Sequence, residues 1–356
     1  MSPRIQLGRR TAMSGLFAAG GALAATGARA QSTGRPTLLP RIDVHAHYLP
    51  DFYRQAAAAA GHEHPDGMPG LPLWDTDRAL GMMDQLSIRA AMLSISSPGV
   101  HFGDDAAARK LARMVNEAGA KAASDHPGRF GLFAALPLPD IDGALAEAAY
   151  ALNVLHADGV AVETNHHGMY MGDPRLDPLF AELNRRRTVV FMHPTSPTCS
   201  CCQALSLGFP RPMIEFMFET TRAVTNMLLT GTFDRFPNVR LIVPHAGAAV
   251  PVLADRVAGL SPALGLPEPL DPDRFFATLR SFYYDLAGYP LPRLAPALLQ
   301  VADPGRIFYG SDWPFTPLPI VTRLAGEMDR TVLFDDATRT RILHDNALDL
   351  FPRLRG

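Results

Sequence analysis

The sequence has few features that would divide it into separate parts or cross-link it. It has 356 residues and only three cysteines, an odd number that excludes a framework built solely from intramolecular disulfides. It has no long Ser/Gly linker, no block of like charges and no short-period repeat, which argues against solenoids and disordered arms. Hydrophobic residues make up 47% and charged residues 19%, so a globular protein with a large core is expected.

The three cysteines, Cys199, Cys201 and Cys202, lie in one short segment. A thiolate zinc site would need a fourth ligand and wider spacing. Adjacent cysteines form a disulfide only with strain, although one local pair is compatible with an oxidising compartment. We therefore interpret these residues as loop thiols or as one regulatory pair rather than as a structural zinc site.

The chain also lacks an excess of positive charge. Its formal net charge is −2, and it becomes −6 without residues 1–30, which contain four arginines and no acidic residue. A mildly acidic protein is a poor partner for nucleic acid or for an anionic membrane surface. We therefore expect neither nucleic acid nor a membrane as a partner of the mature protein.

The first thirty residues have the pattern of an export signal. Arg9-Arg10 precede a weakly apolar run from Ala12 to Gly27, and Ala28-Arg29-Ala30 is a small-x-small cleavage signal. The run is too short and too rich in Ala and Gly to span a membrane comfortably. We predict a signal peptide over residues 1–30, by the twin-arginine route, and export to the periplasm. The alternative is a disordered tail on a cytoplasmic protein.

From residue 41 onward, short apolar runs alternate with helical patterns, as in a parallel sheet buried on both faces. The expected strands are Arg41–Val44, Ala90–Ile95, Phe130–Ala135, Gly159–Glu163, Val189–His193, Val239–Pro244, Ser281–Asp285 and Ile307–Gly310. Eight strands alternating with helices predict a (β/α)8 barrel over residues 41–356, preceded by a linker over residues 31–40. The alternative, an open doubly wound sheet, would need a glycine-rich phosphate loop after its first strand, and Val44–His47 is unlike one.

Two of the expected helices have clear starting residues. Asp104 and Asp140 each precede a helical pattern and are expected to act as N-caps. In the helix after Asp104, Leu111, Met114, Val115 and Ala118 recur at the spacing of one helix face. We therefore expect these four side chains to face the sheet.

Polar residues stand at the carboxyl ends of several expected strands. His45 and His47 follow the first strand, His193 ends the fifth, His245 follows the sixth and Asp312 follows the eighth. The carboxyl ends of barrel strands open on one face, so these side chains can converge. His45 and His47 are two residues apart and point the same way along an extended chain.

This set of side chains suits one divalent metal ion. Three imidazoles and a carboxylate, from His45, His47, His193 and Asp312, would leave a position for water or substrate. We expect Zn²⁺, with Mn²⁺ as the alternative. His245 is expected beside the metal as an acid or base. A second His-x-His, at residues 62–64, is interpreted as a loop coincidence.

The chain resembles the amidohydrolase-2 family, which includes the decarboxylases of aminocarboxymuconate semialdehyde, γ-resorcylate and 6-methylsalicylate. The resemblance runs from Ile42 to about Phe351, is strongest to the 6-methylsalicylate branch, and rests on nine segments. They are Ile42–Pro50, Arg129–Pro137, Phe191–Thr195, Glu219–Arg222, Phe236–Val239, Pro244–Gly247, Phe282–Asp285, Gly310–Pro314 and Asn346–Leu348.

The resemblance implies the same metal ligands and makes His245 and Asp312 the catalytic residues. It also implies that Arg256, eleven residues beyond His245, reaches the substrate carboxylate in the neighbouring subunit of a homodimer. Trp313 is a candidate for stacking on an aromatic substrate, although an aromatic residue at a barrel rim is as often structural.

Two departures argue against the muconate substrate. No arginine directly precedes Trp74-Asp75, and Thr195 stands where the semialdehyde decarboxylase has tryptophan. Lysine is absent after the fourth strand, where Glu163 and His166 lie, so a binuclear site with a carbamylated lysine is not expected.

The resemblance implies non-oxidative decarboxylation of a hydroxyaromatic or enol carboxylic acid. The alternative is hydrolysis of a lactone, ester or amide at the same site, with Asp312 as base and His245 polarising the carbonyl group. The substrate is expected to be selected by the loops His62–Leu73 and Thr195–Pro212, whose conformations the sequence does not predict.

Overall fold

The computed structural model describes residues 38–199, 206–265 and 270–355, which form one compact unit. The predicted signal peptide, most of the linker, and Cys201 and Cys202 lie outside the described residues. Cys199 is disulfide-bonded. In the part of the chain that the structure describes, no helix is both long and apolar enough to cross a membrane.

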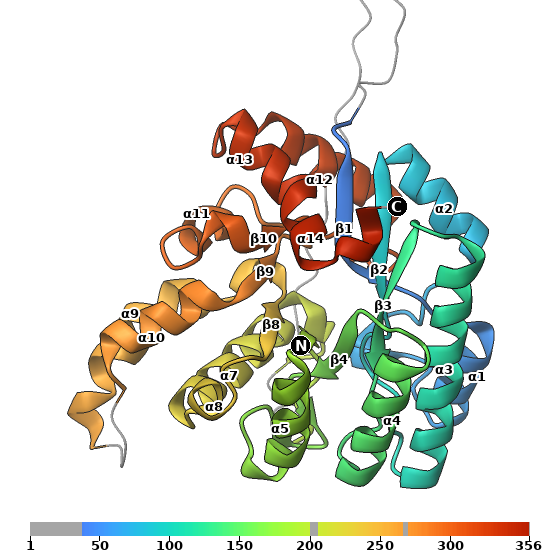
Figure 1. Ribbon diagram of the computed structural model, residues 1–356, viewed down its shortest axis with the longest axis horizontal. Coiled ribbons are helices and arrows are strands. Elements are labelled where there is room, and N and C mark those ends of the chain that lie inside the picture. Colours follow the sequence, from blue (N-terminus) through green and yellow to red (C-terminus); the bar gives the residue numbers. More distant parts are fainter. Residues whose placement is uncertain (1–37, 200–205, 266–269, 356) are drawn as a thin grey trace, which may run out of the picture. The chain divides into compact units, whose positions relative to one another are not determined.

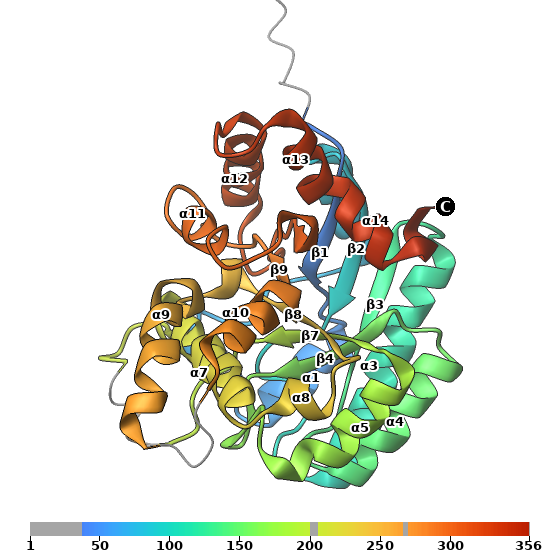
Figure 2. The ribbon, with the colours of Figure 1, turned by 60° about the vertical axis from the view of Figure 1, so that its left-hand side comes forward.

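Eight parallel strands form a nearly closed barrel (Figures 1 and 2). In order around the barrel they are β1 (Arg41–His47), β2 (Ile88–Ser94), β3 (Phe130–Ala135), β4 (Gly159–Glu163), β7 (Val189–His193), β8 (Arg240–Val243), β9 (Tyr283–Asp285) and β10 (Ile307–Phe308). Two parallel bridges, Asp43 to Tyr309 and Ala46 to Trp313, join the first strand to the segment that contains the last. The predicted (β/α)8 barrel is confirmed.

Helices connect the strands and surround them (Figure 2). They are α1 (Asp51–Ala59), α2 (Thr76–Gln85), α3 (Asp105–Asp125), α4 (Ile141–Asn153), α5 (Asp177–Arg186), α7 (Glu215–Leu229), α8 (Thr232–Arg235), α9 (Val250–Leu260), α10 (Pro272–Ser281), α11 (Leu294–Leu298), α12 (Leu318–Arg330), α13 (Asp336–Thr340) and α14 (Asn346–Leu350). A small hairpin, β5 (Asn165–His166) with β6 (Met169–Tyr170), follows β4. The carboxylates of Asp104 and Asp140 accept hydrogen bonds from the first turns of α3 and α4, which confirms both caps.

The predicted inner face of α3 is partly wrong. Leu111 and Val115 are buried, but Met114 is 37% exposed, and small residues take its place against the barrel. At Gly119 the helix lies so close to β3 that an added Cβ would come 2.6 Å from the Leu132 side chain. The contact therefore requires small side chains, and a long Met side chain is placed outside it.

Strand β1 extends further than predicted. It was expected to end at Val44, but it pairs with β2 through His47 and is buried along its whole length. His45 and His47 therefore lie inside a paired strand rather than in the loop after it. Side chains on a paired strand are held more rigidly than side chains on a loop, which suits a metal site.

Candidate metal centre

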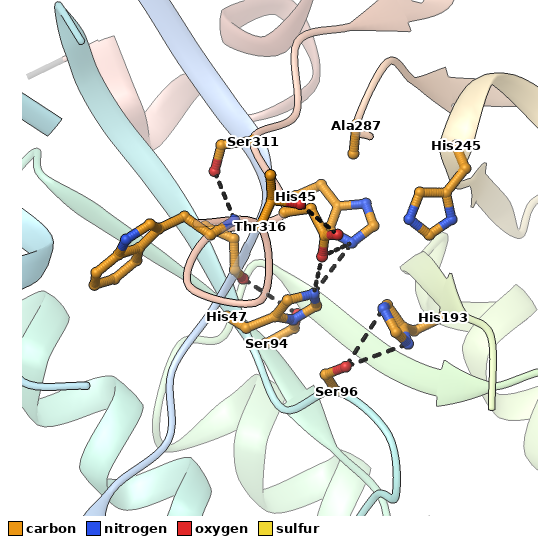
Figure 3. Close-up of polar contacts among 12 residues, drawn as sticks. His45, His47, Ser94, Ser96, His193, His245, Ala287, Ser311 and Thr316 are labelled. Atoms are coloured by element: carbon orange, nitrogen blue, oxygen red, sulfur yellow. Dashed lines mark hydrogen bonds and ion pairs between the residues drawn. The ribbon is translucent and has the colours of Figure 1, made fainter. Parts of the chain in front are cut away.

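His45 and His47 point to the same side of β1 and are completely buried. Their Nε2 atoms lie 3.1 Å apart, and their rings meet edge to face. Two other elements supply the remaining groups: His193 ends β7, and Asp312 follows β10. The ligand atoms of all four residues lie within 4.8 Å of one another, so the structure brings the predicted ligand set together (Figure 3).

Hydrogen bonds on the outer sides of the histidine rings fix their orientation. Nδ1 of His45 lies 3.0 Å from an Asp285 carboxylate oxygen, and Nδ1 of His47 lies 2.9 Å from the Ser94 hydroxyl. Nδ1 of His193 lies 2.7 Å from the carbonyl oxygen of Pro194. Because these partners accept hydrogen bonds, the network assigns each proton to Nδ1 and leaves each Nε2 lone pair facing inward.

These donor atoms fit a divalent cation. Oδ1 of Asp312 lies 3.3 Å from Nε2 of His47 and 3.6 Å from Nε2 of His45. Lone pairs and a carboxylate so close together repel one another unless a positive charge lies among them. Imidazole nitrogen with carboxylate oxygen is a ligand set that zinc, manganese and iron accept.

Burial and mutual contacts shift the pKa values of the ligands. Burial alone would raise the pKa of Asp312, but the close approach of His47 and the charges of the neighbouring histidines hold it well below its usual range. Burial would lower the pKa of His45, but Asp285 and Asp312 reverse this shift and raise it. Burial lowers the pKa of His193 well below its ordinary value, so this ligand is held neutral.

The loop after β10 positions Asp312. Its backbone is in the left-handed region (φ 58°), and its N–H donates to the carbonyl oxygen of His45 over 2.8 Å. The Thr316 hydroxyl donates to Oδ2 over 3.1 Å, which leaves Oδ1 directed at the histidines. A non-glycine residue is seldom found in this conformation, and here the contacts on both sides hold it.

His245 lies beside the four ligands and is not one of them. It follows β8 with a left-handed backbone (φ 54°), and its ring centre is 4.9 Å from that of His45. Its Nδ1 is buried and has no hydrogen-bond partner among the described residues. Burial lowers its pKa to about 4. The structure thus places a histidine without a structural partner next to the cage, as the sequence predicted.

A family profile described as Amidohydrolase matches residues 42–353. The chain is 36% identical over 329 residues to decarboxylase yanB of Aspergillus niger. This alignment covers 89% of each protein. The chain belongs to the amidohydrolase family. It is also 33% identical to the 6-methylsalicylic acid decarboxylase of Penicillium expansum, over 89% of this chain and 98% of that protein.

Among solved structures, a crystal structure of an amidohydrolase II superposes with a TM-score of 0.82 at 34% identity, covering 88% of this chain and 99% of that one. A dihydroxybenzoic acid decarboxylase from Polaromonas, solved with bound manganese and the inhibitor 2-nitroresorcinol, shares the fold. It superposes with a TM-score of 0.75 at 22% identity, and the match covers 89% of this chain and 98% of that one. The relatives bear out an enzyme, a carboxy-lyase of the amidohydrolase superfamily, rather than the alternative hydrolase. The metal site is present, whereas the expected Zn²⁺ is not confirmed.

Sequence reasoning assigned no role to Asp285, the last residue of β9. It is fully buried; one oxygen bonds His45, and the other accepts from the backbone N–H groups of His245 and Ala287, over 3.1 and 3.0 Å. Asp285 therefore orients a ligand and fixes the loop that carries His245. One feature of the sequence could have indicated this role for Asp285. It is an acidic residue at the end of a predicted strand, and the metal ligands end or follow other strands.

The two predicted substrate-binding residues do not join the site within one chain. Arg256 lies on α9 with an exposed side chain. Trp313 is 8% exposed and packs in the hydrophobic core. Trp313 thus packs in the core, and substrate contact by either residue stays a prediction.

A cavity of about 450 Å³ lies above β2, β3, β4 and β7, and one of its lining residues, Glu163, comes within 3.8 Å of the His193 ring. Its walls include Ile95, Leu136, Glu163 and Thr195, which end or follow these strands, and parts of the two loops that were expected to select the substrate. These loops meet, because the Ser196 hydroxyl hydrogen-bonds an Asp66 carboxylate oxygen. His62 and His64 also line the cavity, so their loop contributes to the site although they are not metal ligands.

Proposed function

We propose that this protein is a metal-dependent, non-oxidative decarboxylase of a hydroxyaromatic carboxylic acid. The observation that carries the proposal is the cage of His45, His47, His193 and Asp312, with His245 beside it, in a chain related to decarboxylases over most of its length. The adjoining cavity has apolar and polar walls, as an aromatic acid requires.

A divalent ion held by the four ligands would neutralise and polarise the oxygen atoms of the substrate. The reaction itself exchanges carbon dioxide for a proton: the ring carbon that bears the carboxylate accepts H⁺, the carbon–carboxylate bond breaks, and its electron pair restores aromaticity. We assign the proton transfer to His245, because its Nδ1 has no partner within the described residues and the burial that lowers its pKa makes its protonated form a strong acid. Both oxygens of Asp312 are occupied, one toward the histidines and one by Thr316. Asp312 accordingly acts as a ligand in this scheme.

The metal is proposed to be Mn²⁺, with Zn²⁺ as the alternative. The ligand set accepts both ions, and the manganese of the Polaromonas decarboxylase supports the first. Elemental analysis of protein purified without added metal, followed by chelation and reloading with each ion, distinguishes them. The ion that restores the higher turnover and is present at about one equivalent per chain is the resident metal.

A homodimer is proposed from the exposed face of α9. Val252 is 65% exposed and lies one turn from the exposed Arg256. Further apolar side chains are exposed on and before the neighbouring helix α7: Phe209, Met213, Ile214 and Phe218. An apolar surface of this kind is typical of a subunit interface, and Arg256 would then extend toward the partner's substrate. Light scattering of the wild type and of Val252→Glu tests the dimer, and turnover of Arg256→Ala tests the arginine.

Export to the periplasm is proposed from residues 1–30 alone. Expression of the full chain with a periplasmic extraction, compared with an Arg9→Lys/Arg10→Lys double variant, tests it. The proposal predicts processed protein in the periplasm for the wild type and retention of the double variant in the cytoplasm.

Carbon dioxide release from a panel of ortho-hydroxybenzoates tests the proposed reaction, with aryl esters and lactones run in parallel. The proposal predicts carbon dioxide and the corresponding phenol in equal amounts from at least one acid. Ester or lactone hydrolysis without carbon dioxide release would contradict it and assign the site to a hydrolase.

A further inference from the structure

The cavity beside the metal centre has two chemically different walls. One wall is apolar and is formed by residues that end or follow β2, β3 and β4: Ile95, Val100, Leu136, Leu138 and Ala161. Another part carries two acidic residues, Glu163 and Asp66. An aromatic ring suits the apolar wall, and its substituents then meet the acidic residues.

Glu163 lines the cavity and lies against the outer side of the His193 ring. It ends β4, where it pairs in register with His193 of β7, and it is 7% exposed. Its Oε2 lies 3.8 Å from Nδ1 of His193, too far for a hydrogen bond. This oxygen is buried and has no hydrogen-bond partner in the described chain. The side chain lines the cavity, so a substrate ring that lies in the cavity can contact this carboxyl group.

Asp66 is the second acid with an unused oxygen. It lies in a short helical turn, Pro65–Gly67, with a left-handed backbone (φ 56°), and is 7% exposed. One oxygen accepts from the Ser196 hydroxyl, and the other is buried without a partner within the described ranges. Both carboxyl groups line the same cavity.

Carboxyl groups that line a cavity lose hydration when a ligand enters it, and a ligand that forms hydrogen bonds with them avoids that cost. A ring hydroxyl group both donates and accepts a hydrogen bond, so it can pair with a carboxyl group in either protonation state. A methyl group of similar size can do neither. Sites that provide a hydrogen-bond partner for a substrate hydroxyl discriminate strongly against an analogue that lacks it.

We propose that Glu163, together with Asp66, is a specificity residue that selects a ring hydroxyl over a ring methyl group at the end of the substrate that lies in the cavity. The proposal rests on the proposed decarboxylase function. It predicts a preference for dihydroxybenzoates in a chain whose relatives include an enzyme named for a methyl-substituted acid.

Binding of two phenols to the metal-loaded protein tests the proposal without requiring turnover. Resorcinol and 3-methylphenol differ only by hydroxyl against methyl, and each is the phenol expected from a candidate acid. We expect the wild type to bind resorcinol about tenfold more tightly, and Glu163→Leu to remove this preference. Glu63→Leu is the matched control, because Glu63 is exposed on the same loop as Asp66 and does not line the cavity. It should leave the preference unchanged.

Equal binding of the two phenols by the wild type, or tighter binding of 3-methylphenol, would overturn the proposal. So would an equal loss of affinity for both phenols in Glu163→Leu. If Glu163→Leu does not fold, Glu163→Met decides: it keeps nearly the length of the side chain but offers no hydrogen-bond donor and only a weak sulfur acceptor, so a reduced preference supports the proposal and an unchanged one refutes it.

Turnover of the matched acids, 2,6-dihydroxybenzoate and 6-methylsalicylate, separates this inference from the proposed function. Carbon dioxide release supports the proposed function. A lower ratio of kcat/KM for 2,6-dihydroxybenzoate to kcat/KM for 6-methylsalicylate in Glu163→Leu than in the wild type supports the specificity assignment as well. If no acid of the ortho-hydroxybenzoate panel releases carbon dioxide but the phenol preference is present and depends on Glu163, the proposed reaction fails and the specificity assignment stands.

Discussion

At the amino-terminal end of the barrel, charged side chains face charges of the opposite sign. Arg41, the first residue of β1, forms two hydrogen bonds with the Asp329 carboxylate, and Arg353 pairs with Asp158 just before β4. At the carboxyl-terminal end, inward-facing lone pairs of His45 and His47 lie 3.1 Å apart beside a carboxylate. The first arrangement balances its own charges, whereas the second needs a cation to do so.

This difference indicates a division of roles between the two ends. The closed end, where charges are paired, stabilises the chain. At the open end, His245 and Asp312 have left-handed backbone, and Nδ1 of His245 has no partner among the described residues. These unfavourable features hold the reactive groups in place. Substitutions at one end should therefore change activity and metal binding, and substitutions at the other should change stability. The following predictions test that separation, from the largest expected effect to the smallest.

Asp312→Ala removes a ligand and should abolish both metal retention and carbon dioxide release, by on the order of a thousandfold or more. The metal-free variant should unfold at nearly the same temperature as the metal-free wild type, because the lost carboxylate faces repulsive neighbours. Metal analysis, turnover and thermal unfolding of the two metal-free proteins check this. A variant that keeps its metal and its turnover would break the comparison.

His245→Gln should lower kcat by about 10²- to 10⁴-fold, the range of an acid–base residue. It should leave one metal ion bound per chain, because His245 is outside the ligand set. Single-turnover kinetics with parallel metal analysis measure both quantities. Loss of metal together with activity would instead make His245 a ligand.

Asp329→Ala should lower the free energy of unfolding by about 3 kcal/mol, because it leaves the buried Arg41 guanidinium without its counter-charge. The folded variant should keep the kcat/KM of the wild type. The matched control is Asp336→Ala, whose ion pair with Arg339 uses a carboxylate that is 99% exposed and should change little. Urea unfolding at one protein concentration compares them, and an unchanged midpoint for Asp329→Ala would contradict the assigned role.

Asp285→Asn should weaken metal binding by about 10- to 100-fold, the usual effect of replacing a group that orients a ligand. The carboxylate no longer supports the His45 ring, although the shape of the side chain is kept. Competition with a chelator of known affinity gives the value. Unchanged metal affinity would show that the backbone alone holds His45 in place.

The sequence predicted what depends on local pattern. The strand order follows from short apolar runs, and the ligand cage follows from polar residues at strand ends, because the topology of a barrel brings those ends together. Asp285 also ends a strand, but position alone does not distinguish a ligand from a residue that supports one. The face of α3 was misjudged at Met114 because hydrophobic spacing does not report how closely a helix approaches its sheet.

The cavity could not be predicted in the same way. Its shape depends on contacts between residues distant in sequence, such as the hydrogen bond between Ser196 and Asp66, 130 positions apart. Neither loop has a periodic pattern that would specify this contact. The candidate specificity residues Glu163 and Asp66 are therefore visible only once the loops are placed together.

A metal titration of turnover tests the central claim most directly. Protein stripped with a chelator would be titrated with Mn²⁺ while carbon dioxide release from a responsive ortho-hydroxybenzoate is measured. One cage of four ligands predicts no release without metal, a linear rise, and a plateau at one equivalent per chain. Full release from stripped protein, or a plateau at two equivalents, would contradict a single metal centre formed by His45, His47, His193 and Asp312.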